Sequence, residues 1–271
     1  MTILITGATG LVGERLLPRI AATRGDCRVL VRGDRQMPAG VSAIEGDLLD
    51  PESLAQAVSG VSAIVHLAAV FRTSDDALIW KSNRDGTKAL IAAVQAHAPT
   101  ARFVMASTAH VYDRTSPHPG RETDIVAPDL AYPASKVAAE EALRASGLVW
   151  SILRFPFVYG DGDGHLAMLP AHLDAFAFHP AQRMSTVHHR DIAAAVDMAL
   201  AGRFDRRTVN IADEAPTTIY ELVRLAGGTM ASSSAAMENP WHLHIDAALA
   251  RGLGFQPTVR TVHQAVAEEL V

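Results

Sequence analysis

The segment ILITGATGLVGERLL at Ile3–Leu17 joins a short β-branched run to a helical pattern through Gly7, Gly10 and Gly13. Glycines at this spacing let the backbone turn tightly and approach a pyrophosphate at the positive N-terminal end of the following helix. The alternative is that the three glycines serve only turns and packing. We expect a β-turn-α unit for a dinucleotide, with these residues assigned to cofactor binding: Gly7, Thr9, Gly10, Leu11, Val12 and Gly13.

Short apolar, β-branched runs alternate with segments of helical periodicity beyond this unit. The expected strands are Thr2–Thr6, Arg28–Arg32, Ser42–Glu45, Ala63–Leu67, Arg102–Ala106 and Trp150–Arg154. The expected helices are Leu11–Arg24, Pro51–Val58 with Asp50 as N-cap, Asp76–His97, Pro133–Ala145 and Arg190–Ala201. The alternation predicts an α/β fold, a Rossmann-type doubly wound parallel sheet with helices on both faces.

The composition of the sequence changes after about Phe155, where Phe, Met, His and Pro become frequent. This part is typical of a lid or pocket wall. We therefore expect residues 1–154 to form a dinucleotide-binding Rossmann domain that carries the catalytic residues. Residues 155–271 are expected to form mainly a small C-terminal substrate-binding cap, with segments around 186–212 returning to the Rossmann core.

The composition excludes several classes of protein. With 49% hydrophobic and 20% charged residues, the 271 residues can bury a large core. A net charge of −5 and the lack of a long Lys/Arg run argue against nucleic-acid binding. No apolar run is long enough to span a membrane. The single Cys27 and the opening MTILITGATG, which is not a secretory leader, predict a cytoplasmic location.

The second expected strand lies in RVLVRGDR at Arg28–Arg35. The residue type at the end of this strand indicates whether the cofactor is NAD or NADP, because it contacts the ribose. An acid is typical here when NAD is preferred. Arg32 instead occupies the strand end, and a guanidinium suits a 2′-phosphate. NADP is therefore the expected cofactor, preferred over NAD. The alternative is a solvated Arg32, with Asp34 contacting an NAD ribose.

The stretch YPASK places a phenol at Tyr132 and an ammonium at Lys136, four residues apart. On a helix the two side chains share one face, and a neighbouring cation favours a phenolate. Tyrosine ordinarily titrates near 10, so an efficient base at neutral pH needs such help. The alternative is a helix start with Pro133 at its first position and an exposed lysine.

Five motifs occur in the order of one known superfamily. They are the glycine loop, Asp47-Leu48, HLAA at His66–Ala69, STAHVY at Ser107–Tyr112, and YPASK. With them the chain resembles the extended short-chain dehydrogenase/reductases, and best their NAD(P)-dependent epimerase/dehydratase branch, from Thr2 to about Ala195.

The resemblance implies roles for individual residues. Tyr132 is the acid/base, Lys136 lowers its pKa and holds the nicotinamide ribose, and Thr108 orients the substrate oxygen, with Ser107 the adjacent alternative. Further residues are implied to line or support the cofactor site: Asp47 and Leu48 near adenine, Leu67, Ala68 and Ala69 in the groove, Asn83, Pro156 and Val158.

The chain departs from the nucleotide-sugar members at RFPFVYGD, Arg154–Asp161. Phe157 stands where those members commonly have an asparagine, and Asp161 where they have a proline. An aromatic ring cannot make the amide's hydrogen bonds, so we expect a small, partly apolar pocket. Candidate lining residues, which could instead be ordinary core, are Phe71, His110, Phe155, Phe157, Met168, His172, Phe176 and Phe178.

The twelve histidines do not predict a metal site, because none matches a compact zinc spacing with a supporting acid. His188 aligns with a V-H-x-x-D motif of the family, where a structural role is expected.

Three functions compete. The first is an NADP-dependent carbonyl reductase or alcohol dehydrogenase acting on a small molecule. The second is an NAD(P)-dependent sugar epimerase or dehydratase, in which hydride leaves and returns within one cycle; T108-A-H110 lacks the acid expected of a dehydratase. The third is a cofactor-sensing protein without turnover, which the intact Thr108, Tyr132 and Lys136 argue against. A homodimer through the long helices is also expected.

Overall fold

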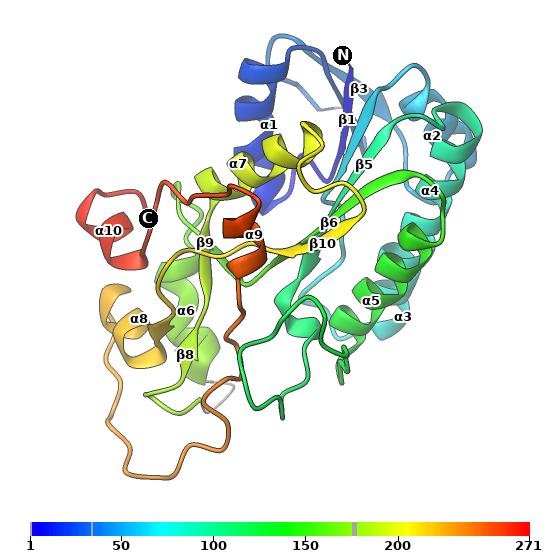
Figure 1. Ribbon diagram of the computed structural model, residues 1–271. Coiled ribbons are helices and arrows are strands. Elements are labelled where there is room, and N and C mark those ends of the chain that lie inside the picture. The colour runs from blue at the N-terminus through cyan, green and yellow to red at the C-terminus, as the bar shows by residue number, and fades with distance from the viewer. Residues whose placement is uncertain (1, 34, 175–177) are drawn as a thin grey trace.

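Seven parallel strands form the central sheet of the protein (Figure 1). The computed structural model describes residues 2–33, 35–174 and 178–271. In order across the sheet the strands are β10 (Arg207–Asn210), β6 (Val149–Phe155), β5 (Arg102–Thr108), β4 (Ala63–His66), β1 (Ile3–Thr6), β2 (Cys27–Val31) and β3 (Val41–Glu45). The predicted Rossmann-type doubly wound sheet is confirmed.

The direction in which the sheet is built reverses at β1. From β1 the chain adds β2 and β3 on one side, and then β4, β5 and β6 on the other. Ligands of open α/β sheets bind at the carboxyl ends of the strands next to such a reversal. Thr6 and His66 are paired there, at the ends of β1 and β4.

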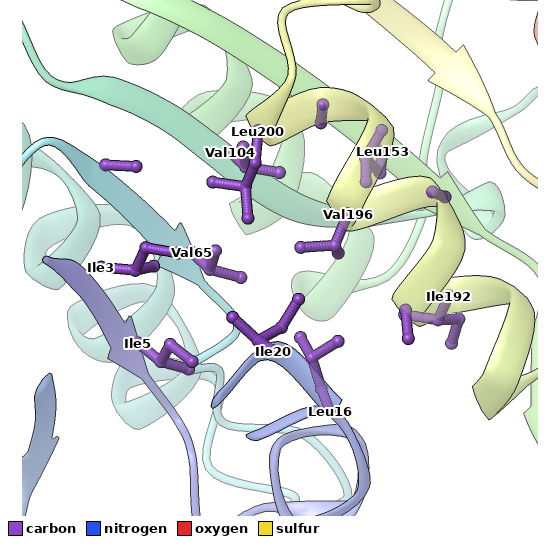
Figure 2. Close-up of a cluster of buried hydrophobic side chains, with 14 of the residues drawn as sticks. Ile3, Ile5, Leu16, Ile20, Val65, Val104, Leu153, Ile192, Val196 and Leu200 are labelled. Atoms are coloured by element: carbon purple, nitrogen blue, oxygen red, sulfur yellow. The ribbon is translucent and has the colours of Figure 1, made fainter. Parts of the chain in front are cut away.

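Each face of the sheet has its own hydrophobic cluster, because successive strand residues point to opposite faces. Ile3 and Ile5 pack with α1 (Leu11–Arg24) and α7 (His189–Leu200), as Figure 2 shows. Leu4 packs on the other face with α2 (Pro51–Val58), α4 (Gly86–His97) and α5 (Ala131–Arg144). Burying one such aliphatic side chain contributes about 1.5–3 kcal/mol, so the two clusters hold the helices on the sheet.

Most elements begin and end within a few residues of the expected positions. Asp50 caps α2 as predicted, since its carboxylate accepts hydrogen bonds from the backbone N–H groups of Glu52 and Ser53 at 3.2 and 3.3 Å.

The predicted helix Asp76–His97 is interrupted. It consists of α3 (Asp76–Trp80), a π-helical turn at Lys81–Asp85, and α4. Asn83 lies in this wider turn, and its side chain is fully buried against other segments. π-Helical turns often occur at functional sites, and this one faces the start of α5.

The C-terminal region is small and packs around a third apolar cluster. Its strands are β7 (Phe157–Tyr159), which pairs with β9 (Thr186–His188), and β8 (Arg183–Met184), which pairs with β11 (Thr217–Thr218). The helices of this cluster are α6 (His165–Asp174), α8 (Ile219–Leu225) and α10 (Val262–Ala267). The short α9 (Ala248–Gly252) packs instead with α1 and α7, since Ala250 belongs to their cluster. Within this half of the chain, β10 joins the main sheet beside β6, and α7 packs against α1.

Candidate active site

The turn between β1 and α1 is built on glycines that have no room for a side chain. Gly7 has a φ of +74°, and a Cβ there would lie 2.5 Å from the backbone nitrogen of Ala68. A Cβ on Gly13 would overlap the carbonyl oxygen of Gly7. The backbone of the turn therefore lies against the residues that follow β4. The N-cap of α1 is the exposed Gly10, so no side chain covers the N-terminus of the helix there. This cradle fits a dinucleotide pyrophosphate.

The neighbouring strand ends supply the other predicted cofactor residues. Arg32 follows β2 directly and is exposed. Asp47 lies after β3, where its carboxylate accepts from the N–H of Leu49 at 2.9 Å, and Leu48 packs close to Gly86. Asp34, the alternative ribose contact, lies outside the described residues. The described residues at this edge of the sheet are therefore compatible with NAD or NADP, and the exposed Arg32 places a cation at the end of β2.

The end of β5 points two hydroxyls in opposite directions. Thr108 accepts a hydrogen bond from the N–H of His110 at 3.2 Å, and no described residue takes its O–H. That O–H can therefore donate to a substrate oxygen. Ser107, the alternative to Thr108, donates to the buried carboxylate of Glu140 at 2.6 Å and is turned away from this role.

Tyr132 and Lys136 lie one turn apart on the first turns of α5, which begins two residues earlier than expected. Tyr132 is half-buried, and Lys136 is 2% exposed. No hydrogen bond joins the ammonium of Lys136 to the residues that the structure describes. A buried ammonium that lacks a hydrogen-bond acceptor, one helical turn from a phenol, is well suited to a ribose hydroxyl, which supports the fit of a nicotinamide nucleotide.

The electrostatics differ from the expectation that Lys136 holds the tyrosine pKa down. Burial raises the pKa of Tyr132 to about 12, because a phenolate would lose its hydration. Burial also lowers the pKa of Lys136 to about 8, and the carboxylate of Glu140 partly opposes this. By the protein's own residues, Tyr132 is therefore held as a phenol, the form that donates a proton.

The side chain of Asn83 is hydrogen-bonded to residues at the start of α5 and in the loop after β4, and it does not face an open site. Its amide nitrogen donates to the backbone oxygen of Val70 at 2.9 Å and to the hydroxyl of Ser135 at 3.0 Å, and its oxygen accepts from the N–H of Val70 at 2.7 Å. Ser135 in turn donates to the backbone oxygen of Tyr132 at 2.7 Å. All these partners are protein groups, so the predicted supporting role fits better than a cofactor contact.

His66 of the HLAA motif is fully buried at the end of β4. Thr87 donates its hydroxyl to the backbone of Asn83, so Nε2–H of His66 donates to Thr87 at 2.8 Å, and Nδ1 accepts from Thr6 at 2.6 Å. Burial and the nearby Lys136 lower the pKa of His66 to about 3. The imidazole is thus a neutral tie between β1, β4 and α4.

A line of side chains forms a wall from Tyr132 to α6. The ring of Phe71 lies 4.7 Å from that of Tyr132, between centroids, and the guanidinium of Arg72 lies 5.1 Å from the centroid of Phe71. Arg72 has a φ of +61° and donates to Nε2 of His165 at 2.5 Å. The ring of His165 stacks 5.9 Å from Phe157. This wall joins the loop after β4 to the first turn of α6.

The remaining residues predicted for the substrate pocket, and Pro156 and Val158 predicted for the cofactor site, differ in their exposure. Met168 on α6 and His110 after β5 are exposed, and Pro156 and Val158 are half-buried on either side of Phe157. Phe155 was expected to line the pocket, but it is 5% exposed and packs in the core cluster of α1 and α7, because its strand position points inward. Phe178 is half-buried in the third cluster, while Phe176 and the side chain of His172 lie outside the described part of the chain.

Asp161 has a role that the sequence did not reveal. Its carboxylate pairs with Arg19 of α1 at 2.9 Å and lies 3.4 Å from Arg190 of α7. These ion pairs connect the loop that follows β7 to α1 and α7. A proline at this position has no charged side chain and could not form them.

The adjacent His188 and His189 also have protein partners. His188 lies 2.9 Å from the backbone oxygen of Leu270, and His189 lies 2.9 Å from the carboxylate of Asp163. Within the described ranges, no group of three or more His, Cys, Asp or Glu side chains could hold a metal ion. No helix in the same ranges is long and apolar enough to cross a membrane.

Sequence comparison agrees with this geometry. A model described as the NAD dependent epimerase/dehydratase family matches residues 3–212. The ceramide reductase of Caulobacter vibrioides is 34% identical over 164 residues, which cover 59% of this chain and 47% of that protein. The 2-alkyl-3-oxoalkanoate reductase of Stenotrophomonas maltophilia is 33% identical over 189 residues, which cover 61% and 53%. The chain spans about half the length of these two relatives.

Structural comparison shows the same fold. A short-chain dehydrogenase/reductase superfamily protein from Agrobacterium tumefaciens, solved with bound NAD, superimposes with a TM-score of 0.81. The match covers 99% of this chain and 95% of that chain at 22% identity.

Proposed function

Because the chain belongs to the NAD-dependent epimerase/dehydratase family, and so is an NAD(P)-dependent enzyme of the extended short-chain dehydrogenase/reductase type, we propose that it is an NADP-dependent carbonyl reductase or alcohol dehydrogenase for a small, partly apolar substrate. The observation that carries the proposal is the set of an available Thr108 hydroxyl, a protonated Tyr132 and an apolar Phe71 at one end of the sheet. Both curated relatives named above are reductases, which supports this reaction over the others.

Different residues of the chain would bind the cofactor, orient the substrate and transfer the proton in such a reaction. The glycine turn would hold the pyrophosphate, Arg32 a 2′-phosphate, and Lys136 a ribose hydroxyl. A bound nicotinamide nucleotide would supply hydride to the carbonyl carbon or, in the reverse direction, accept it from the alcohol carbon. Thr108 would donate its O–H to the carbonyl oxygen and so fix its position. Tyr132 Oη would transfer its proton to that oxygen as negative charge develops there, and in the reverse direction it would take the proton back.

We propose the corresponding division of the chain, with residues 1–154 as the cofactor domain and 155–271 mainly as the cap. The pairing of β10 with β6 and the packing of α7 on α1 support the return of residues around 186–212 to the Rossmann part. The cytoplasmic location and the homodimer remain predictions, and light scattering at working concentration tests the latter.

The first experiment mixes the purified protein with NADPH, and separately with NADH, and a panel of aldehydes, ketones and sugars. Loss of reduced nicotinamide and conversion of the substrate are followed in parallel. Conversion with equal NADPH consumption is expected. Conversion without net consumption would instead favour the sugar epimerase, and a lack of any conversion across a broad panel would contradict the reductase.

A further inference from the structure

A buried carboxylate lies one helical turn beyond Lys136 on α5. Glu140 is fully buried, and its two oxygens accept four hydrogen bonds. Ser107 Oγ donates at 2.6 Å, Arg154 donates from Nε and Nη2 at 3.0 and 2.7 Å, and Arg144 donates at 2.5 Å. The acceptor capacity of the carboxylate is therefore used by partners from three elements, β5, β6 and α5.

These bonds fix the strand residue next to Thr108. Neighbouring residues of a strand point to opposite faces, so holding Ser107 toward α5 directs Thr108 to the other side. The same helix carries Tyr132 and Lys136. Glu140 thereby links the position of the Thr108 hydroxyl to that of the phenol and the ammonium.

The carboxylate also lies among buried cations. Lys136 and Arg154 are each only 2% exposed. The bidentate Arg154 pair, with Ser107 and Arg144, lowers the pKa of Glu140 although burial opposes this, so the group stays ionised. Burial lowers the pKa of Lys136 to about 8, and Glu140 is the charge that opposes the shift.

The network continues from Arg154 toward the last strand of the sheet. Arg154 Nη1 donates to the hydroxyl of Tyr112 at 3.1 Å, and Tyr112 donates to Asn210 of β10 at 2.6 Å. Arg154 is therefore fixed at both ends and presents a rigid partner to Glu140.

We propose that Glu140 is a positioning residue for the Thr108–Tyr132–Lys136 site: its carboxylate ties the end of β5 to α5 and balances the buried ammonium of Lys136. The inference rests on the roles proposed for Tyr132 and Lys136. It does not require any particular substrate.

The sequence makes the test direct, because its only lysines are Lys81, Lys88 and Lys136. Protein labelled with ¹³C at the lysine ε-carbon should give three signals, and the variants Lys81→Arg and Lys88→Arg identify the exposed pair by the loss of one signal each. The titration of Lys136 is then followed by NMR in the wild type, Glu140→Gln and Ser107→Ala.

In Glu140→Gln the midpoint of the Lys136 titration should fall by about one pH unit, because the nearest opposing charge is lost. NADPH binding, followed by fluorescence, should weaken as the pH rises and Lys136 loses its charge. In Glu140→Gln the midpoint of this loss should lie about one pH unit lower than in the wild type. In Ser107→Ala the charge is kept, so the midpoint should stay close to that of the wild type. Equal shifts in the two variants would overturn the charge argument.

Glu140→Gln leaves the buried Arg154 without its partner and could destabilise the fold, which circular dichroism melts would reveal. Two further variants keep the test decisive. Glu140→Asp should restore the Lys136 midpoint at least partly, and Glu140→Gln/Arg154→Met removes both buried charges and should still lower it. An unchanged midpoint in the folded double variant would overturn the proposal. Because the readouts are lysine titration and NADPH binding, failure of carbonyl reduction would be seen separately.

Discussion

The ring of Phe71 packs against that of Tyr132 with 4.7 Å between centroids and 42° between planes, although Phe71 is 52% exposed. A large apolar side chain that touches the proposed proton donor and yet faces solvent can contact a substrate beside its carbonyl group. We predict that Phe71→Ala raises KM about tenfold for substrates with an apolar substituent, since about 1.5 kcal/mol of contact is lost. kcat should change little.

Phe71→Tyr is the matched control, because it keeps the ring at the same place. Steady-state kinetics on the compounds found in the first panel measure the split between KM and kcat. Equal loss for apolar and for small polar substrates would contradict a substrate contact.

Removing the phenolic hydroxyl should stop the chemistry without emptying the cofactor site. Tyr132→Phe is expected to lower kcat by about 10²–10⁴-fold, the usual contribution of a positioned acid or base. NADPH binding should stay within a few-fold of the wild type. Tyr220→Phe, at an exposed tyrosine of α8, is the control and should leave both quantities unchanged.

Retained turnover in Tyr132→Phe would show that another group supplies the proton. Loss of NADPH binding together with turnover would point instead to a damaged α5.

The cation at the end of β2 should decide between the two nicotinamide nucleotides. We predict that Arg32→Asp weakens NADPH binding by about tenfold or more, because a charge-assisted contact to a 2′-phosphate is replaced by repulsion. NADH binding should be unchanged or improved. Arg35→Asp makes the same charge change at another exposed position of the loop. Isothermal titration of both nucleotides measures the preference, and an equal effect of the two variants would mean a general charge effect.

The close contact of the glycine turn predicts a sharp contrast between two similar substitutions. A Cβ at Gly13 would overlap the carbonyl oxygen of Gly7, whereas a Cβ at Gly10 would lie 3.3 Å from the same atom. Gly13→Ala should therefore lower the free energy of unfolding by about 1–3 kcal/mol, the usual cost of overpacking, and Gly10→Ala by much less. Denaturant titration compares them, and equal stabilities would contradict the described turn.

The buried His66 should make the protein sensitive to acid. Its pKa is about 3 in the folded protein and near 6.5 when unfolded, so the unfolded chain binds more protons between these values. The stabilisation is complete above about pH 6.5 and is lost as the pH falls. At pH 5 the neutral His66 has cost the protein about 2 kcal/mol of its free energy of unfolding.

Unfolding by urea between pH 4 and 8 measures this dependence. His66→Gln should be less stable at pH 7 but should show a flatter slope below pH 6.5. His97→Gln, at an exposed position, should keep the wild-type slope. An unchanged slope in His66→Gln would assign the acid sensitivity to other histidines.

Local sequence rules were sufficient for much of the backbone. The turn between β1 and α1 follows from glycine spacing, the N-terminus of α2 from Asp50, and the parallel sheet from alternating periodicities. The π-helical turn at Lys81–Asp85 could not be predicted in this way, because it accommodates Asn83, whose partners Val70 and Ser135 are distant in the sequence.

The sequence by itself determined the family, the sheet and the set of candidate side chains, because glycine geometry, helix caps and periodicity act between near neighbours. The tertiary structure decided the state of those side chains. It turned Ser107 toward Glu140, buried Phe155, and raised the pKa of Tyr132. Hydrogen bonds and pKa values depend on burial and on partners from other elements, and only the packed sheet and helices bring these together.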